Sequence, residues 1–452
     1  MSARGAQPPK VLRGRILWFT ADPRTAPEPA HHYIEDGALI IEHGLVRQAG
    51  EAWPTLASLP QGTQVEDHRP HLIMPGFIDP HIHFPQTQVI ASFGAQLLDW
   101  LQKYTFIEEQ KFSDPAHCAR NARFFFDEIL RNGTTTAVAF CSVHAQSVEA
   151  FFAESQRRNT LMIAGKVLMD RNAPEALRDT AESGYEESKA LITKWHKRGR
   201  QRYAIAPRFA VTSSESQLEA AGALAREHTD CHVETHLSEN EAEIALVREL
   251  FPWSRDYTDV YAHYGLLGPK TLLGHCIHMS ARERAVLADA RSVAVFCPTS
   301  NLFIGSGLFD WRATTEAGVR IGVATDVGGG TSYSMLRTMA EAYKVLQLQG
   351  QNLPALQAFH AITRGNAEAL GLEDVIGSFE PGCACDAVVL DSSATAAMRH
   401  RMATVRTLEE ELFLLMTLGA DRNVAATYVM GERVHGGPGH VARPKAGPRD
   451  RA

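Results

Sequence analysis

Two histidines separated by one residue end an apolar run in the first quarter of the chain. Residues 75–83 read PGFIDPHIH, with His81 and His83 at the end. If this run is a strand, side chains two residues apart point to the same face, so both imidazoles can reach one metal ion. Because the chain contains 20 histidines, the pair alone is weak evidence, and the prediction of a metal site needs further ligands.

Three more candidate ligands end apolar runs later in the chain. His236 ends VETH, His275 ends LLGH and Asp326 ends GVATD. Each of them alone is more often a hydrogen-bonded core residue than a ligand. Together with the first pair they give four imidazoles and a carboxylate, a set that favours a divalent cation. Zinc is the first candidate, because it prefers such donors and can keep one position open for water.

Glu239 follows His236 by three residues, in the sequence HLSEN. One helical turn would bring its carboxylate beside water at the metal, where it could carry a proton. An exposed acidic residue in a charged stretch is the alternative, since Glu241 and Glu243 follow closely. We favour the proton carrier because a candidate ligand is its neighbour.

Strand-like apolar runs alternate with amphipathic segments such as residues 115–131 and 215–228. The eight runs span residues 72–83, 134–140, 161–169, 202–208, 231–236, 271–275, 292–297 and 320–326. This alternation predicts βα units in an α/β fold, either a (β/α)₈ barrel of the TIM type or a doubly wound open sheet. The candidate ligands favour the barrel, because they fall at the ends of their runs, where barrel enzymes place functional groups.

The flanks of this region differ in character from its centre. Short β runs, interrupted by Gly, Pro, Asp or Glu, occur at residues 38–41, 387–390 and 427–430. They predict one small, β-sandwich-like domain assembled from both chain ends. We therefore expect the following segments: small domain 1–72 and 377–435, catalytic barrel 73–376, and a disordered tail 436–452 that is rich in Gly, Pro and basic residues.

Composition restricts the classes of function. The 452 residues are 44% hydrophobic and carry a formal net charge of -7, which gives no general attraction to nucleic acid. The chain has no apolar run of about 18 residues, and its start lacks the apolar region of a secretory signal. Seven cysteines are too few to indicate a disulfide framework. We expect a cytoplasmic enzyme that acts on a small molecule and binds neither membrane nor nucleic acid.

The motifs around these residues resemble the amidohydrolase superfamily, specifically its deaminase branch with a single metal. The motifs are PGFIDxHxH at 75–83, HLSEN at 236–240, GHC at 274–276 and ATD at 324–326. A second group is similar to guanine deaminases: HFPQ at 83–86, GKVLMD at 165–170, PRF at 207–209, CPTSNL at 297–302 and TDVGGG at 325–330. The resemblance extends over about residues 70–435. The first group of motifs does not determine the substrate, and the second group favours guanine.

The resemblance implies a role for each candidate residue. One zinc ion per chain would be bound by His81, His83, His236 and Asp326, with His275 as a ligand or close partner. The purine would contact Gln86, Arg208 and Phe209, and also His83, His236, Glu239 and Asp326. Gln86 can donate and accept, Arg208 can only donate and suits a carbonyl, and Phe209 offers an apolar face to a flat base.

The implied reaction is hydrolysis of guanine to xanthine and ammonia by a homodimeric enzyme of purine catabolism. Zinc would lower the pKa of the water that attacks C2. Asp326 would orient this water and take its proton, Glu239 would protonate the adjacent ring nitrogen, and His275 would polarise the reacting centre or hold the nucleophile.

Three alternatives stay open at this point. Another deaminase or hydrolase of the superfamily could act on adenosine-like, pterin or triazine substrates, although Gln86 and Arg208 argue against it. A two-metal enzyme like the hydantoinases is disfavoured, because the fourth predicted strand ends at Arg208, whereas those enzymes have a bridging lysine. The third alternative is a purine-binding protein without catalysis, which would release no ammonia.

Overall fold

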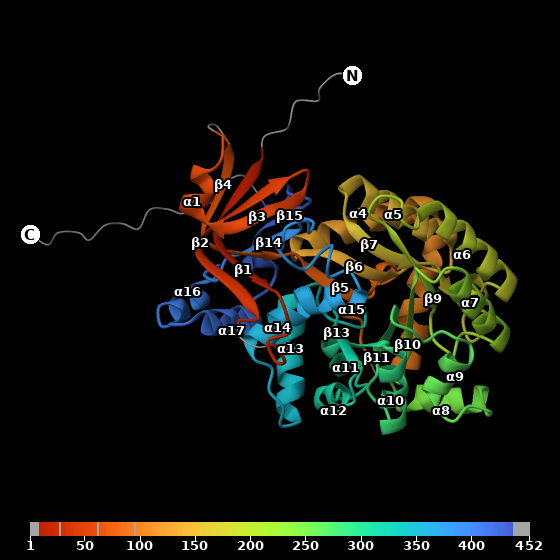
Figure 1. Cartoon of the computed structure of the whole chain (residues 1–452). Helices are drawn as coiled ribbons and strands as arrows, with labels where there is room; N and C mark the ends of the chain where they lie inside the picture. The colour runs from red at the N-terminus through yellow and green to blue at the C-terminus, as the bar shows by residue number, and fades with distance from the viewer. Residues whose placement is uncertain (1–8, 27–28, 61–62, 95, 437–452) are drawn as a thin grey trace, which may run out of the picture.

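The computed structural model describes residues 9–26, 29–60, 63–94 and 96–436. In this part of the chain a β/α barrel lies beside a small β domain built from both ends (Figure 1). Residues 437–452, almost all of the predicted disordered tail, lie outside the described residues. None of the described helices is both long enough and apolar enough to span a membrane.

The described residues include eight parallel barrel strands, which pair in chain order. They are β5 (Phe77–His83), β6 (Thr134–Phe140), β7 (Leu161–Gly165), β9 (Arg202–Pro207), β10 (His232–Leu237), β11 (Thr271–His275), β12 (Val293–Phe296) and β13 (Arg320–Val323). The short β8 (Val167–Leu168) pairs with β9 beyond the end of β7. The predicted barrel is therefore confirmed, and the open sheet is excluded.

Contacts between the first and last strands bring the barrel close to closure. The backbone N–H of Asp326 donates to the carbonyl of His81 at 3.0 Å. Inside β5, the buried carboxylate of Asp79 accepts from the backbone N–H of Thr325 at 3.1 Å and also from its hydroxyl. Burial raises the pKa of Asp79 to about 6, although these hydrogen bonds act to lower it. The contacts fix the end of β13 against the strand that carries the histidine pair.

Helices cover the outside of the barrel, and the predicted amphipathic segments are two of them, α4 and α7. Asp114 caps α4 by accepting from the backbone N–H groups of Ala116 and His117, and Pro115 starts the helix, where a missing N–H costs nothing. The helices are α4 (Pro115–Arg131), α5 (Ala145–Arg158), α6 (Ala181–Trp195), α7 (Glu215–Glu227), α8 (Glu241–Leu250), α9 (Tyr257–His263), α10 (Ala281–Ala290), α11 (Pro298–Phe303), α12 (Trp311–Glu316), α13 (Met335–Leu348), α14 (Ala355–His360) and α15 (Asn366–Leu370).

A helical insertion follows β5 and forms one wall of the cavity described below. It consists of a 3₁₀ turn (Phe84–Gln86), α2 (Leu97–Trp100), a π-helical turn (Leu101–Thr105) and α3 (Phe106–Glu109). π-Helical turns are uncommon and often lie at functional sites. Beyond the HFPQ motif at 83–86, which supplies Gln86, this insertion carries no motif identified from the sequence.

The small domain contains one seven-stranded sheet with the order β16-β15-β14-β4-β1-β2-β3. Its elements are β1 (Lys10–Phe19), β2 (His31–Glu42), β3 (Leu45–Glu51), α1 (Ala52–Ala57), β4 (Gln64–Pro75), β14 (Ala387–Leu390), β15 (Val424–Val429) and β16 (Glu432–His435). Separate apolar clusters contain the neighbours Leu12 and Val11, so side chains on both faces of the sheet are buried. The assembly of this domain from both chain ends confirms the prediction.

Two features of the flanks differ from what the sequence analysis expected. The C-terminal flank also contains α16 (Ala396–Met402) and α17 (Leu408–Leu418), and α17 packs against α13 and α14 of the barrel. The apolar run 72–83 contains parts of two strands, because β4 ends at Pro75 and β5 begins at Phe77. Gly76 lies between them, where any side chain would overlap Thr135 of β6. The run stays apolar across the change because both strands are buried there.

A buried ion pair joins the two domains. Arg200, just before β9, donates from both terminal nitrogens to the carboxylate of Asp386, just before β14. The same carboxylate accepts from the backbone N–H of Met430 at 2.9 Å. The Asp386 side chain is 3% exposed and the Arg200 side chain 13%, so the pair is largely shielded from water.

The substitution Asp386→Asn should lower the free energy of unfolding by about 3 kcal/mol, because it leaves the largely buried Arg200 without its counter-charge. Glu432→Gln is the control, since it removes the exposed partner of Lys10 and should cost at most about 1 kcal/mol. Guanidinium unfolding followed by tryptophan fluorescence measures both changes. Equal losses in the two variants would contradict the role assigned to the buried pair.

Candidate active site

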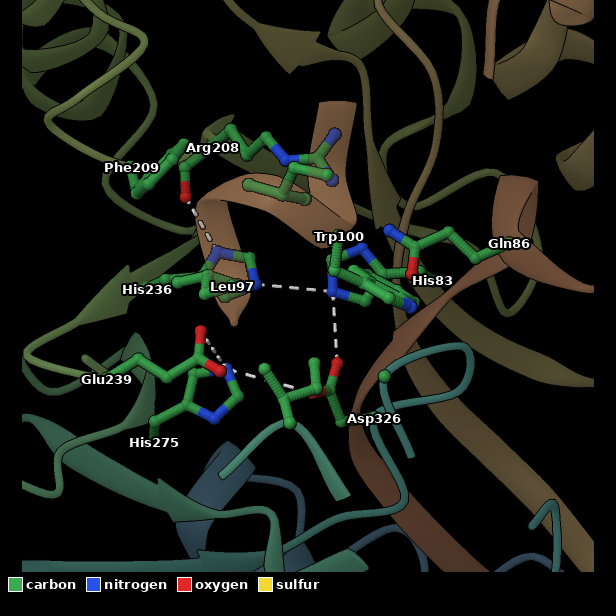
Figure 2. A pocket seen from close by; sticks show the side chains of 13 residues that line it. His83, Gln86, Leu97, Trp100, Arg208, Phe209, His236, Glu239, His275 and Asp326 are labelled. Carbon is green, nitrogen blue, oxygen red and sulfur yellow. Dashed lines mark hydrogen bonds and ion pairs between the residues drawn. The ribbon is translucent and has the colours of Figure 1, made fainter. Parts of the chain in front are cut away.

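The five predicted ligands converge at the C-terminal mouth of the barrel. His83, His236, His275 and Asp326 point toward one another in Figure 2. Nε2 of His83 lies 3.1 Å from Oδ1 of Asp326 and 3.2 Å from Nε2 of His236. Nε2 of His81 lies 3.4 Å from the same oxygen of Asp326. One ion could therefore contact ligand atoms from β5, from β10 and from Asp326, three residues after the end of β13.

The nitrogen atoms of this cluster are arranged to accept a cation. Nδ1 of His236 lies 2.7 Å from the carbonyl oxygen of Arg208, a contact that needs a proton on Nδ1 and leaves a lone pair on Nε2. Both ring nitrogens of His81 are buried without a hydrogen-bond partner among the described residues. Since buried polar atoms are normally paired, these orphaned nitrogens fit a bound metal ion.

Burial sets the charge states that the cluster favours. It lowers the pKa of His83 to about 4, and with the neighbouring imidazoles it lowers the pKa of His236 well below its usual value. Burial alone would raise the pKa of Asp326, but the adjacent imidazoles of His81 and His83 hold this pKa well below the usual range. Neutral imidazoles and an ionised carboxylate are the forms that bind divalent metals.

His275 lies on the side of the cluster that faces Glu239. Its Nδ1 contacts Oδ1 of Asn301 at 2.8 Å, and its Nε2 lies 3.3 Å from Oε2 of Glu239 and 3.7 Å from Oδ2 of Asp326. Cys297 also has its sulfur near this group. Burial raises the pKa of the Cys297 thiol well above its usual value, which disfavours the thiolate needed for metal binding.

Glu239 lies in the loop between β10 and α8, with its carboxyl group buried beside the cluster. Its Oε1 accepts a hydrogen bond from the hydroxyl of Ser306 at 2.9 Å. Burial and the nearby Asp326 carboxylate raise the pKa of Glu239 to about 8. Its position and its raised pKa therefore allow Glu239 to exchange a proton with a ligand in the adjoining cavity.

A cavity adjoins the cluster. Gln86 and Arg208 approach it from one side, and Glu239 and His275 from another (Figure 2). The predicted substrate residues that line it are His83, Gln86, Arg208, Phe209, His236, Glu239 and Asp326. Gly329 of the TDVGGG motif also lines the cavity, together with four residues that were not predicted from the sequence: Leu97, Trp100, Leu101 and Ile304. Most of these are apolar and suit a flat aromatic ligand.

The sequence model of the amidohydrolase family matches residues 72–434. The chain belongs to the amidohydrolase family. The family predicted from the histidine and aspartate motifs is thus confirmed, and the match includes all the barrel strands and the candidate metal site.

This amidohydrolase is similar to proteins named guanine deaminase. It is 46% identical over 431 residues to guanine deaminase of Escherichia coli (strain K12), a match that covers 94% of this chain and 98% of that protein. The solved structure of E. coli guanine deaminase has a TM-score of 0.92 at 45% identity, covering 95% of this chain and 99% of that chain. Guanine deaminase from C. acetobutylicum, solved with bound guanine in its active site, has a TM-score of 0.84 at 27% identity, covering 94% and 100%.

Two residues of this amidohydrolase contact the predicted site residues but were not predicted from the sequence. Glu109 on α3 contacts both Gln86 and Arg208, and Ser306 contacts Glu239. Glu109 stands in a short polar segment like many exposed ones, and Ser306 stands in a glycine-rich loop, so neither position carries a signal in the sequence.

Gly274 makes room for the buried imidazole of His81. A Cβ atom at residue 274 would lie 2.5 Å from Cε1 of that ring, closer than side-chain atoms pack. The next residue, His275, has a left-handed backbone with φ of 71°, which is uncommon for a residue other than glycine and often marks a functional site.

The substitution Gly274→Ala should weaken the binding of a divalent metal by at least about tenfold, because the added methyl displaces the His81 ring. Gly268→Ala, just before the same strand, is the matched control, since the nearest atom to its added Cβ would be 4.0 Å away. Competition with a chromophoric chelator measures both affinities. If the two variants bind metal equally well, His81 is not held in a metal site by this packing.

Proposed function

We propose that this amidohydrolase is a zinc-dependent deaminase that converts guanine and water to xanthine and ammonia. One observation carries the proposal. A single cavity has the hydrogen-bond donors of Gln86 and Arg208 on one side, and Glu239 with the candidate metal ligands on the other. The relative of 46% identity that is named guanine deaminase supports the choice of substrate. Other deaminases of adenosine-like, pterin or triazine substrates remain the alternative.

His81, His83, His236 and Asp326 would hold one zinc ion per chain, with His275 as a further ligand or close contact. Imidazoles with one carboxylate suit zinc, and the orphaned nitrogens of His81 fit such a role. When bound, zinc lowers the pKa of water and supplies Lewis-acid chemistry.

Recognition of the base would come from Arg208, Gln86 and Phe209. The guanidinium of Arg208 only donates, so it suits the carbonyl oxygen at position 6 of guanine. The Gln86 amide can donate and accept, as the edge of the base requires. Phe209 and Trp100 line the cavity with aromatic rings that exclude water from the faces of the base.

Asp326 and Glu239 would move the protons of the reaction. The ionised Asp326 orients the attacking water and takes one of its protons as the oxygen adds to C2 of guanine. Glu239 donates a proton to the adjacent ring nitrogen, which makes C2 more electrophilic, and His275 polarises the reacting centre. The exocyclic nitrogen then takes the proton held by Asp326, its bond to C2 breaks, and ammonia leaves. The proton of the added hydroxyl returns to Glu239 as the C2 carbonyl of xanthine forms.

Three further parts of the proposal concern the protein in the cell. We expect a homodimer, a cytoplasmic location and a role in purine catabolism. They rest on the resemblance to guanine deaminases, on the composition of the chain and on the small-molecule substrate. Size-exclusion chromatography with light scattering would test the homodimer.

The substitution Glu239→Gln should retain zinc but lower kcat for guanine by at least about 100-fold, since the amide keeps the shape and cannot carry the proton. Glu241→Gln, at an exposed position two residues later, is the control and should keep near-normal turnover. Ammonia release and elemental analysis give both quantities. Loss of zinc from the first variant would instead make Glu239 a ligand, and unchanged turnover would refute its role.

The substitution Arg208→Ala should remove most activity on guanine while zinc is retained. In the wild type, kcat/KM for guanine should exceed that for adenine by about a thousandfold, because the amino group of adenine cannot accept from the buried guanidinium. Arg202→Ala, at the opposite end of β9, is the control. Equal use of both purines by the wild type would overturn the guanine assignment and leave only a broader deaminase.

A further inference from the structure

The carboxylate of Glu109 links the two side chains that would recognise the base. Its Oε1 accepts from Nε2 of Gln86 at 3.1 Å, and its Oε2 accepts from Nη1 of Arg208 at 2.6 Å. The residue is 1% exposed, and it lies behind the described residues that line the cavity. One turn earlier on the same helix, the ring of Phe106 lies 5.5 Å from Cζ of Arg208. Helix α3 thus holds the guanidinium from two sides.

This contact also fixes which way the Gln86 amide points. Its Oε1 accepts from the backbone N–H of Gly328 at 3.2 Å, while its Nε2 donates to Glu109. The amide is therefore held at both ends in one orientation, with one N–H and one lone pair left for a ligand. A carboxylate is required at this position of the network, because both of its contacts come from donors.

The pairing also sets the charge of the base-binding side of the cavity. Arg208 is the only basic side chain of the lysine or arginine type among the described residues that line the cavity. With Glu109 in direct contact, the pair has no net charge, so an anionic ligand gains little Coulomb energy there. His144 is a further titratable group that interacts with Glu109, and burial lowers its pKa below the usual value, which favours the neutral ring.

We propose that Glu109 is a specificity-determining positioning residue that makes the site accept a neutral lactam base and release an anionic one. The inference rests on the proposed function, in which guanine is the substrate and xanthine the product. Xanthine is more acidic than guanine and forms an anion near neutral pH. By cancelling the charge of Arg208, Glu109 prevents the ionised product from being held by an unpaired guanidinium, and so limits product inhibition.

The test is equilibrium binding of two purines to the zinc-loaded protein by calorimetry. Hypoxanthine keeps the carbonyl at position 6 and stays neutral to higher pH than xanthine, so it reports recognition without ligand charge. Above the pKa of xanthine, Glu109→Gln should raise the affinity for xanthine relative to hypoxanthine by at least about tenfold. Below that pKa the ratio should match the wild type. Glu108→Gln on the same helix, where Glu108 pairs with Lys111 in a more exposed position, should leave the ratio unchanged at both pH values.

A second variant keeps the proposal testable if Glu109→Gln fails to fold. Arg208→Gln leaves Glu109 as the unpaired charge, so the same ratio should fall by at least about tenfold above the pKa of xanthine. If either variant changes the affinities for xanthine and hypoxanthine by the same factor at both pH values, Glu109 does not act through its charge and the inference is overturned. Normal purine binding without ammonia release from guanine would overturn the proposed function alone.

Discussion

The carboxylate of Asp326 is buried against the imidazoles of His81, His83 and His275, and the rest of the structure depends on keeping this group in place. An ionised carboxylate out of water is costly unless its partners are fixed. The partners come from β5 and β11, so their positions require a nearly closed barrel. Asp79 supplies part of this closure, because it ties Thr325, the residue before Asp326, to the strand that carries the two histidines.

Arg208 connects the two halves of the site. Its backbone carbonyl contacts Nδ1 of His236 and so leaves Nε2 of that ring free toward the cluster. Its side chain, held by Glu109 and Phe106, lines the side of the same cavity that is proposed to bind the base. In the proposed function, one residue therefore sets the position of the base relative to the metal. A shift of the end of β9 would disturb recognition and metal binding together.

The sequence predicts the elements that carry repeated or spaced signals. Alternation along a strand places His81 and His83 on one face, and the ends of apolar runs locate His236, His275 and Asp326. The sequence does not predict Glu109, because its contact with Arg208 spans 99 positions and its neighbourhood resembles an ordinary helix surface. The sequence also does not show where β4 ends and β5 begins, because both strands are buried and apolar there. These features depend on contacts between distant segments, which spacing cannot show.

In the proposed function, one zinc ion at the barrel mouth supports hydrolysis of guanine beside Glu239 and Arg208. The most direct measurement is a zinc titration of protein stripped by a chelator, followed by ammonia release from guanine. We expect activity to rise in proportion to added zinc and to reach a plateau at one zinc per chain. Full activity in the stripped protein, or a plateau only at two zinc ions per chain, would contradict the account.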